Sequence, residues 1–308
     1  MNGMLLAAGR GERMEPLSTV VAKPALEVLG RPLLASALEH LVRAGCRPIV
    51  VNLHRHPEQV EAAARAAGGA ALRFSREPEL LGGAGGVAAA RAHFAPGPVL
   101  VANADTWSDL DLAPVLGELA LDNAVLALLP HPDPGRWGSV VLEPSGHVAA
   151  FLAPGAAGPG ERFLFTGFQA LGDEIVRGLP DPPAEMGEVW RALLRRRKLL
   201  GVRVQGRWRE AGSPEAYRAL VAGLLGGGSW VDPGARIAPG AELTASAIGA
   251  GCRVGAAATV RDSVVTAGAS IAAGSEVRRC IVAGAVTVPR GSSHEDALVL
   301  PSGCFPLR

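Results

Sequence analysis

Two glycines and two cations near the amino terminus have the types and spacing of a phosphate-binding loop. Residues Leu5 to Pro24 read LLAAGRGERMEPLSTVVAKP, so Gly9 and Gly11 follow an apolar run, and Arg13 and Lys23 come next. Glycines after a strand allow a tight turn in which backbone N–H groups approach phosphate oxygens. Arginine adds a planar fork of donors and lysine a compact charge. An ordinary turn with two solvated cations is the alternative, but Gly-x-Gly-x-Arg with a later Lys-Pro favours a phosphate site.

A carboxylate that could bind a metal ion follows another apolar run. Asp105, within Asn-Ala-Asp, comes after residues 98–102, which we expect to form a strand. Its side chain would face the same sheet edge as the glycine turn, where Mg²⁺ bound to nucleotide phosphates needs a hard oxygen ligand. An aspartate that only caps the next turn is the alternative, and the glycine turn favours the metal. We expect Asp109 and Asp111 to be turn and cap residues.

A second segment of small residues lies between these two motifs. Residues 77–86 read EPELLGGAGG and precede a helix predicted over residues 87–92. Such a segment before a helix N-terminus predicts a second loop of close backbone approach. On composition alone, a flexible connector is an equal alternative.

The elements that must position these motifs alternate between strands and helices. We predict helices over 32–44, 58–67 (stopped by Gly68 and Gly69), 110–119, 189–200 and 214–225, the last capped by Ser213. We predict strands over 4–6, 48–53, 72–75, 124–129 and 163–171, with a hairpin over 136–152. This alternation predicts an α/β fold with a mostly parallel, Rossmann-like sheet and helices on both faces. In such sheets, ligands bind beyond the carboxyl ends of the strands.

Past a linker over 226–230, the period of the apolar residues changes. Aliphatic residues open units of six, six and five residues, so three units span 17 residues; the openers are Val231, Ile237, Leu243, Ile248, Val254, Val260, Val265, Ile271, Val277, Val282 and Val288. A short fixed period predicts a β-solenoid, here over 231–293, followed by a tail over 294–308. We expect the solenoid to serve packing or homo-oligomerisation.

Composition limits the classes of partner. The chain has 308 residues, 48% of them hydrophobic, and a net charge of +1, so it shows no nucleic-acid footprint and no charge suited to a membrane surface. No apolar run reaches membrane-spanning length, and no basic signal region opens the chain. The four cysteines are far apart, which predicts free or buried thiols in a reducing cytoplasm.

The N-terminal motifs resemble those of the sugar-1-phosphate nucleotidyltransferases. The form Gly-Glu-Arg-Met-x-Pro-Leu at residues 11–17 is most similar to the N-acetylmuramate-1-phosphate uridylyltransferase and mannose-1-phosphate guanylyltransferase branches. The resemblance covers roughly residues 1–225 and implies a nucleotidyltransferase domain there. The C-terminal units resemble the hexapeptide left-handed parallel β-helix.

The resemblance implies a role for each motif residue. It implies that Arg13 stabilises the reacting phosphates, that Lys23 contacts phosphate, and that Glu77 accepts hydrogen bonds from the base. It also implies further nucleotide contacts by Leu6, Ala7, Ala8, Gly9, Gly11, Gly82 and Gly83, and sugar contacts by Gly138, Thr166 and Gly167. For Thr166 and Gly167, a buried strand with a glycine bulge is an equal alternative.

The metal and sugar motifs depart from the family pattern in two places. The resemblance implies Mg²⁺ bound by Asp105 and by residue 210, where this chain has Glu210 instead of aspartate, and Mg²⁺ tolerates little departure from octahedral geometry. Many relatives have Phe-x-Glu-Lys-Pro, whose charges hold the sugar phosphate, where this chain has Phe151-Leu-Ala-Pro154.

We therefore expect an enzyme that converts a nucleoside triphosphate and a sugar 1-phosphate into a nucleotide sugar and pyrophosphate, with Mg²⁺ as cofactor. Because of Glu210 and the missing Glu-Lys pair, a second function stays open: a regulatory homologue that binds a nucleotide sugar but has little turnover. An acyltransferase that uses the solenoid is a weaker alternative, because His294, the histidine nearest the repeat, lies past its last clear unit. The base and the sugar stay open.

Overall fold

The computed structural model describes residues 1–68 and 71–307. Gly69, part of the predicted helix stop, and Arg308, the end of the predicted tail, lie outside these ranges. The chain divides into two compact units: Met1–Gly9 with Leu34–Trp208, and Arg10–Leu33 with Arg209–Arg308. The boundaries predicted at 225 and 230 stay predictions, whereas the repeat runs past the boundary predicted at 293. The division into units places Arg10–Leu33 together with the C-terminal part of the chain.

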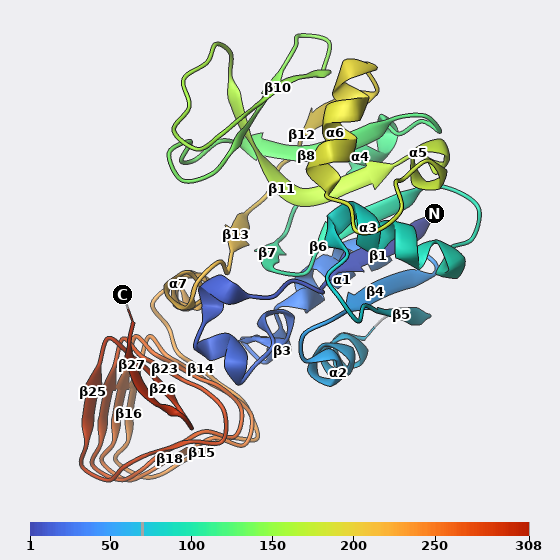
Figure 1. Cartoon of the computed structure of the whole chain (residues 1–308). Coiled ribbons are helices and arrows are strands. Elements are labelled where there is room, and N and C mark those ends of the chain that lie inside the picture. The colour runs from blue at the N-terminus through green and yellow to red at the C-terminus, as the bar shows by residue number, and fades with distance from the viewer. Residues whose placement is uncertain (69–70, 308) are drawn as a thin grey trace. The chain divides into compact units, whose positions relative to one another are not determined.

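A nine-stranded sheet forms the centre of the first unit (Figure 1). Its strands are β1 (Asn2–Leu6), β4 (Ile49–Leu53), β5 (Leu72–Arg76), β6 (Val99–Asn103), β8 (Ala124–Pro130), β9 (Ser139–Leu142), β10 (Val148–Leu152), β11 (Arg162–Leu171) and β12 (Leu199–Arg203). The order is β10-β9-β11-β6-β1-β4-β5, with β8 paired to β11 and β12. A short strand, β7 (Thr106–Ser108), follows β6.

The sheet is mixed, and its parallel part carries the predicted motifs. β1 runs parallel to β4 and β6, and β4 runs parallel to β5. β11 runs antiparallel to β6, β8 and β9. The predicted α/β fold is confirmed, and the antiparallel half comes from β11 and the β9–β10 hairpin, which short connections can join.

The helices of the first unit connect these strands. They are α1 (Leu34–Arg43), α2 (Pro57–Ala67), α3 (Gly82–Ala89), α4 (Ala113–Gly117), α5 (Asp173–Arg177) and α6 (Met186–Arg195), with a 3₁₀ turn η4 (Ala90–His93). Side chains from strands and helices, such as Met4, Val101, Phe163 and Met186, form one buried core.

Three predicted helices differ from the structure by three or more residues at one or both ends. The helix predicted over 189–200 ends at Arg195, because Arg197 has left-handed backbone geometry (φ 53°), and the next residues form β12. α4 is shorter than predicted and has Pro114 in its first turn, where proline is favoured. α3 begins at Gly82, five residues before its predicted start.

The second unit begins with the cation-bearing segment. It contains 3₁₀ turns η1 (Glu12–Met14), η2 (Leu17–Thr19) and η3 (Lys23–Ala25), then β2 (Glu27–Val28), β3 (Arg31–Pro32) and α7 (Pro214–Leu225). The strand β13 (Trp208–Glu210) spans the boundary between the units. The predicted cap of α7 is confirmed, because Ser213 Oγ accepts from the Ala216 N–H at 3.2 Å.

The predicted solenoid is confirmed as stacked turns of short strands (Figure 1). One sheet contains β14 (Trp230–Val231), β17 (Ala247–Ile248), β20 (Val264–Val265), β23 (Ile281–Val282), β26 (Ala297–Leu300) and β27 (Gly303–Pro306). The second contains β15 (Arg236–Ile237), β18 (Arg253–Val254), β21 (Ser270–Ile271) and β24 (Thr287–Val288), and the third β16 (Glu242–Thr244), β19 (Thr259–Arg261), β22 (Glu276–Arg278) and β25 (Ser293–Glu295). Parallel partners are 17 residues apart, as in Val231 with Ile248. From Ile248 onward, every predicted opener is buried.

The solenoid continues into residues predicted to be a tail. His294 pairs with Val277, and Val299 pairs with Val282, so both stand where the period places openers. The repeat was missed there because His294 is not aliphatic. β27 then folds back antiparallel on β26.

Candidate active site

The turn after β1 is tied to β4 and to Glu77 by one asparagine. The Ala7 N–H donates to Asn52 Oδ1 at 2.7 Å, and Asn52 Nδ2 donates to Glu77 Oε1 at 2.8 Å. The Leu81 N–H donates to Glu77 Oε2 at 3.3 Å. The structure therefore brings together two predicted nucleotide-binding segments. Asn52 was missed because it lies in an apolar run without a motif, although it is the one polar residue of β4.

Glu77 faces the protein. Glu77 is only 4% exposed, and both of its carboxylate oxygens accept hydrogen bonds from the protein. Its contact with a base stays a prediction, and in this arrangement Glu77 orients Asn52 and the start of α3.

The small residues of 82–86 form the start of α3 and make room for other parts of the chain. A Cβ on Gly82, whose φ is +75°, would lie 2.4 Å from the Ala184 carbonyl oxygen. A Cβ on Gly86 would lie 2.9 Å from both Asn52 Nδ2 and Glu77 Oε1. The expected close approach is present, but its described partners are protein atoms, and the segment is a helix where a loop was predicted. Nucleotide contacts by Gly82 and Gly83 stay a prediction.

Asp105 lies where the sequence predicted it, in the turn after β6. The neighbouring acidic residues have structural roles. Asp111 Oδ1 accepts from the N–H of Ala113, the first residue of α4, at 3.0 Å, although the cap position itself is Leu112. Asp109 accepts from the backbone N–H and side chain of Arg207, and these hydrogen bonds lower the pKa of its carboxyl. Asp109 and Asp111 thus have local hydrogen-bonding roles, and metal binding by Asp105 stays a prediction.

The predicted sugar contacts lie on β11 and before β9. Thr166 is fully buried, and its hydroxyl donates to the Ala127 carbonyl at 2.9 Å. Gly167 has a φ of +90° within the register shift between β11 and β8, which is the glycine bulge weighed from the sequence. Gly138 precedes β9, and its carbonyl faces His131 Nε2 at 3.1 Å. Sugar contacts by these three residues stay predictions, and one by Thr166 would have to use its backbone or a rearranged side chain.

In the second unit, the predicted cations lie on short turns. Gly11 has a φ of +65°, which glycine adopts readily, and Ser18 Oγ donates to its carbonyl at 3.0 Å. Arg13 Nη2 donates to Glu210 Oε1 at 3.0 Å, so the predicted catalytic cation and the predicted metal ligand form an ion pair. Lys23 begins η3.

The added length of Glu210 is accommodated by a neighbouring glycine. A Cβ on Gly212 would lie 3.1 Å from both carboxylate oxygens of Glu210. The glutamate therefore folds back over a position that has no side chain.

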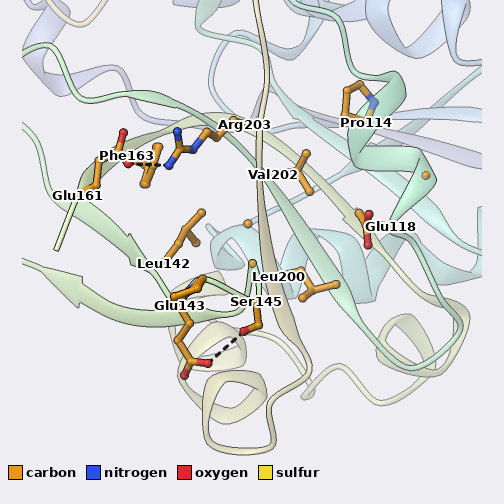
Figure 2. A pocket seen from close by; sticks show the side chains of 14 residues that line it. Pro114, Glu118, Leu142, Glu143, Ser145, Glu161, Phe163, Leu200, Val202 and Arg203 are labelled. Carbon is orange, nitrogen blue, oxygen red and sulfur yellow. Dashed lines mark hydrogen bonds and ion pairs between the residues drawn. The ribbon is translucent and has the colours of Figure 1, made fainter.

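A separate pocket lies elsewhere in the first unit. Figure 2 shows this pocket of about 750 Å³ beside the β9–β10 turn, β12 and α4. None of the predicted site residues lines it, and two of its three glutamates, Glu143 and Glu161, pair with Arg197 and Arg203. The pocket is therefore distinct from the predicted site residues that lie in this unit.

No helix among the described residues is long and apolar enough to cross a membrane. The cytoplasmic location stays a prediction.

Comparisons with known proteins identify both parts of the chain. Residues 2–225 match the family described as nucleotidyl transferase, and residues 227–294 match the family described as GlmU-like, C-terminal hexapeptide. The chain is 31% identical over 221 residues to an N-acetylmuramate alpha-1-phosphate uridylyltransferase of Neisseria meningitidis, covering 69% of this chain and 94% of that protein. It is 27% identical over 268 residues to a mannose-1-phosphate guanylyltransferase of Mycobacterium tuberculosis, covering 80% and 74%.

A solved structure supports the fold. A putative glucose-1-phosphate thymidylyltransferase from Bacillus anthracis, in complex with sucrose, superposes with a TM-score of 0.63 over 72% of this chain and 94% of that one, at 20% identity. At this identity, the likeness concerns the fold alone. The chain therefore belongs to the nucleotidyl transferase family, where its relatives are sugar-1-phosphate nucleotidyltransferases, and it is an enzyme of that family with a GlmU-like hexapeptide region on its C-terminal side.

Proposed function

We propose that the chain transfers a nucleotidyl group from a nucleoside triphosphate to a sugar 1-phosphate in a magnesium-dependent reaction. A phosphate oxygen of the sugar attacks the α-phosphorus and forms the new P–O bond. The bond from the α-phosphorus to the bridging oxygen of the β-phosphate breaks, and pyrophosphate leaves with its electrons. Because the transferred group needs little covalent help, the rate depends on positioning and on charge stabilisation.

The observation that carries this proposal is the hydrogen-bonded link Ala7–Asn52–Glu77. It fixes the backbone turn that follows β1, at the carboxyl end of a parallel strand, where ligands bind in open α/β sheets. In this proposal the backbone of Ala8, Gly9 and Gly11 supplies groups to the phosphates, while Leu6 and Ala7, whose N–H already donates to Asn52, contact other parts of the nucleotide. Arg13 and Lys23 supply the positive charge that offsets the charge on the reacting phosphates.

The donor chemistry fits a magnesium ion that arrives with the nucleotide. Among residues 1–68 and 71–307, no group of three or more histidine, cysteine, aspartate or glutamate residues could form a complete metal site. Mg²⁺ in such enzymes is held by one or two carboxylates together with phosphate oxygens and water. Asp105 and Glu210 are the carboxylates proposed to hold it. When bound, the ion neutralises charge on the phosphates.

The names of the relatives support uridine or guanosine triphosphate as the donor. The proposal is tested by measuring pyrophosphate release with UTP, GTP, dTTP, ATP and CTP, each with N-acetylmuramate 1-phosphate, mannose 1-phosphate and glucose 1-phosphate in the presence of Mg²⁺. We expect one pair to turn over and the Asp105→Asn variant to lose activity by about 100-fold or more. The Asp111→Asn variant is the matched control and should keep activity, because the Asp111 side chain accepts from the Ala113 N–H at the start of α4.

Pyrophosphate release, combined with a binding measurement, distinguishes an active enzyme from a homologue that only binds nucleotide sugars. Thermal shift with each triphosphate and nucleotide sugar reports binding without turnover. Tight binding of a nucleotide sugar with no pyrophosphate release from any pair would overturn the catalytic proposal. The solenoid acyltransferase finds no support, because His294 Nε2 is a buried atom and its Nδ1 faces Cys304 Sγ at 3.6 Å.

A further inference from the structure

The segment that carries Arg13 and Lys23 forms one compact unit with the solenoid, although some 200 residues separate them in the chain. The backbone from Lys23 to Glu27 is a single short turn. The Leu26 N–H donates to the Lys23 carbonyl at 3.2 Å, and Glu27 then begins the β2–β3 pair. Whatever holds Glu27 in place therefore also limits the positions open to Lys23.

Glu27 is held from two sides. Its backbone carbonyl accepts from the Tyr217 hydroxyl of α7 at 2.5 Å, and Tyr217 is fully buried. Its side-chain Oε2 accepts from the Ala267 N–H of the solenoid at 3.2 Å. A Cβ on Gly249 would lie 2.5 Å from the same oxygen, so the solenoid leaves space for this carboxylate at that point.

Other turns of the solenoid contact the same segment. A Cβ on Gly30 would lie 2.7 Å from the Trp230 ring, and a Cβ on Gly284 would lie 2.6 Å from Val20 Cγ1. Trp230 lies on β14, and Ala267 and Gly284 lie two residues after the ends of β20 and β23; the three strands belong to a single solenoid sheet. Successive turns of one face thus support the segment from Val20 to Gly30.

The carboxylate of Glu27 is not a favourable choice for stability alone. Burial raises the pKa of Glu27, and the Asp232 carboxylate adds to this, while the Ala267 and Gly30 N–H groups oppose it. Its Oε1 is buried and has no hydrogen-bond partner in the described part of the chain. A buried acceptor with one unpaired oxygen costs stability, so the contact is explained less well by stability than by its effect on the position of the segment.

We propose that Glu27 is a positioning residue for the nucleotidyl transfer and that the solenoid is the support on which the Arg13–Lys23 segment is held in its reactive geometry. This inference rests on the proposed function for its kinetic part only. It gives the solenoid a role within one chain, independent of homo-oligomerisation, because every contact that carries it lies within the second unit.

The test compares the full-length Glu27→Ala, Glu27→Gln and Val277→Ala variants with the wild type. Glu27→Ala removes the acceptor, whereas Glu27→Gln keeps an oxygen that can accept from the Ala267 N–H. Val277 is fully buried in β22, and its truncation weakens the solenoid core without touching the segment. It therefore controls for a general loss of stability.

Hydrogen exchange of the unliganded proteins gives the first readout. We expect Glu27→Ala to speed exchange of backbone amides in residues 12–28 by about tenfold or more, while Glu27→Gln and Val277→Ala leave these rates within about twofold of the wild type. Wild-type exchange rates in Glu27→Ala would overturn the proposal. This readout needs no turnover, so it remains valid even if the wild type releases no pyrophosphate with any substrate pair. That outcome would refute the proposed function but not the positioning of the segment by Glu27.

Kinetics gives the second readout. We expect kcat to fall about tenfold or more in Glu27→Ala, to be restored in Glu27→Gln, and to be unchanged in Val277→Ala despite a lower Tm. An equal loss of kcat in Val277→Ala would show that Glu27 acts only through stability and would overturn the proposal. If Glu27→Ala does not fold, Tyr217→Phe replaces it, because this variant removes only the hydroxyl that donates to the Glu27 carbonyl. The same exchange and kinetic results then support or overturn the proposal.

Discussion

Arg13 donates a hydrogen bond to Glu210, with Nη2 at 3.0 Å from Oε1, across 197 positions of the chain. In this state, the guanidinium offsets part of the charge of the carboxylate. A divalent ion at Glu210 would replace that charge and leave Arg13 able to contact phosphate. The ion pair thus links the proposed metal ligand to the proposed phosphate-binding cation, and metal binding should be sensitive to the exact placement of the Glu210 carboxylate.

The Gly212→Ala variant tests that sensitivity. The new Cβ would lie 3.1 Å from both Glu210 oxygens, which is closer than ordinary van der Waals contact, so the carboxylate must move. We expect the Mg²⁺ concentration for half-maximal activity to rise by about tenfold, as for residues that orient metal ligands. Gly117→Ala is the control, because no atom lies within 4 Å of its added Cβ. An unchanged Mg²⁺ requirement in Gly212→Ala would argue against Glu210 as a ligand.

Truncation of Asn52 should affect both stability and nucleotide binding. Asn52→Ala leaves the Ala7 N–H and Glu77 Oε1 without their partner, and each unpaired buried group costs about 1–3 kcal/mol of unfolding free energy. We also expect a higher KM for the triphosphate, because the turn after β1 loses its anchor. Asn123→Ala, which removes hydrogen bonds to Ala120 and Glu118, should lose comparable stability in urea denaturation with no change in KM. A wild-type KM in Asn52→Ala would remove this asparagine from the proposed site.

His40 should make the first unit less stable in mild acid. Burial lowers the pKa of His40, the nearby Arg43 lowers it further, and its Nε2 lies 3.0 Å from Ser108 Oγ. Since the unfolded chain then binds a proton more readily than the folded one, the His40 contribution is complete above about pH 6.5 and is lost as pH falls toward the folded pKa. Unfolding free energies at about pH 7.5 and about pH 5.5 should differ more in the wild type than in His40→Gln. Equal differences in the two proteins would contradict the assignment.

One of the four thiols should react rapidly in the native protein. Cys304 is exposed, whereas Cys46, Cys252 and Cys280 are buried and free. Burial raises the pKa of Cys46 and of Cys252 to about 11, so little thiolate forms there near neutral pH. A thiol reagent should label one cysteine in the native state and four after unfolding, and Cys304→Ser should abolish the fast reaction. Fast labelling of a second thiol would show that the buried cysteines open to solvent.

Sequence patterns predicted the helices and strands better than they predicted which residues contact one another in the fold. The apolar periods located β1, β4, β6 and the solenoid openers, because burial on one face imposes those periods directly. The glycines of 82–86 indicated close approach, but not what approaches. The structure shows the chain itself filling that space, including the Ala184 carbonyl.

Residues without a local pattern could not be found in this way. Asn52 has its role because β4 runs beside β1, a pairing between residues far apart in the chain. His294 continues the solenoid because it pairs with Val277, although its own side chain breaks the aliphatic series. Glu27 gained its partner from Ala267, some 240 positions away. Contacts of this kind follow from the packed fold and leave no trace in composition or spacing.

The pairing of residues 17 positions apart also constrains how this chain can change its length. Deleting one residue inside the solenoid would shift every later side chain by one place. Aliphatic side chains that face the core would then face outward, and polar side chains would face the core. Removal or duplication of an entire turn would preserve the register. Viable length variants should therefore differ by whole turns, and those that keep the turns beside Glu27 and Gly30 should also keep the support of the amino-terminal segment.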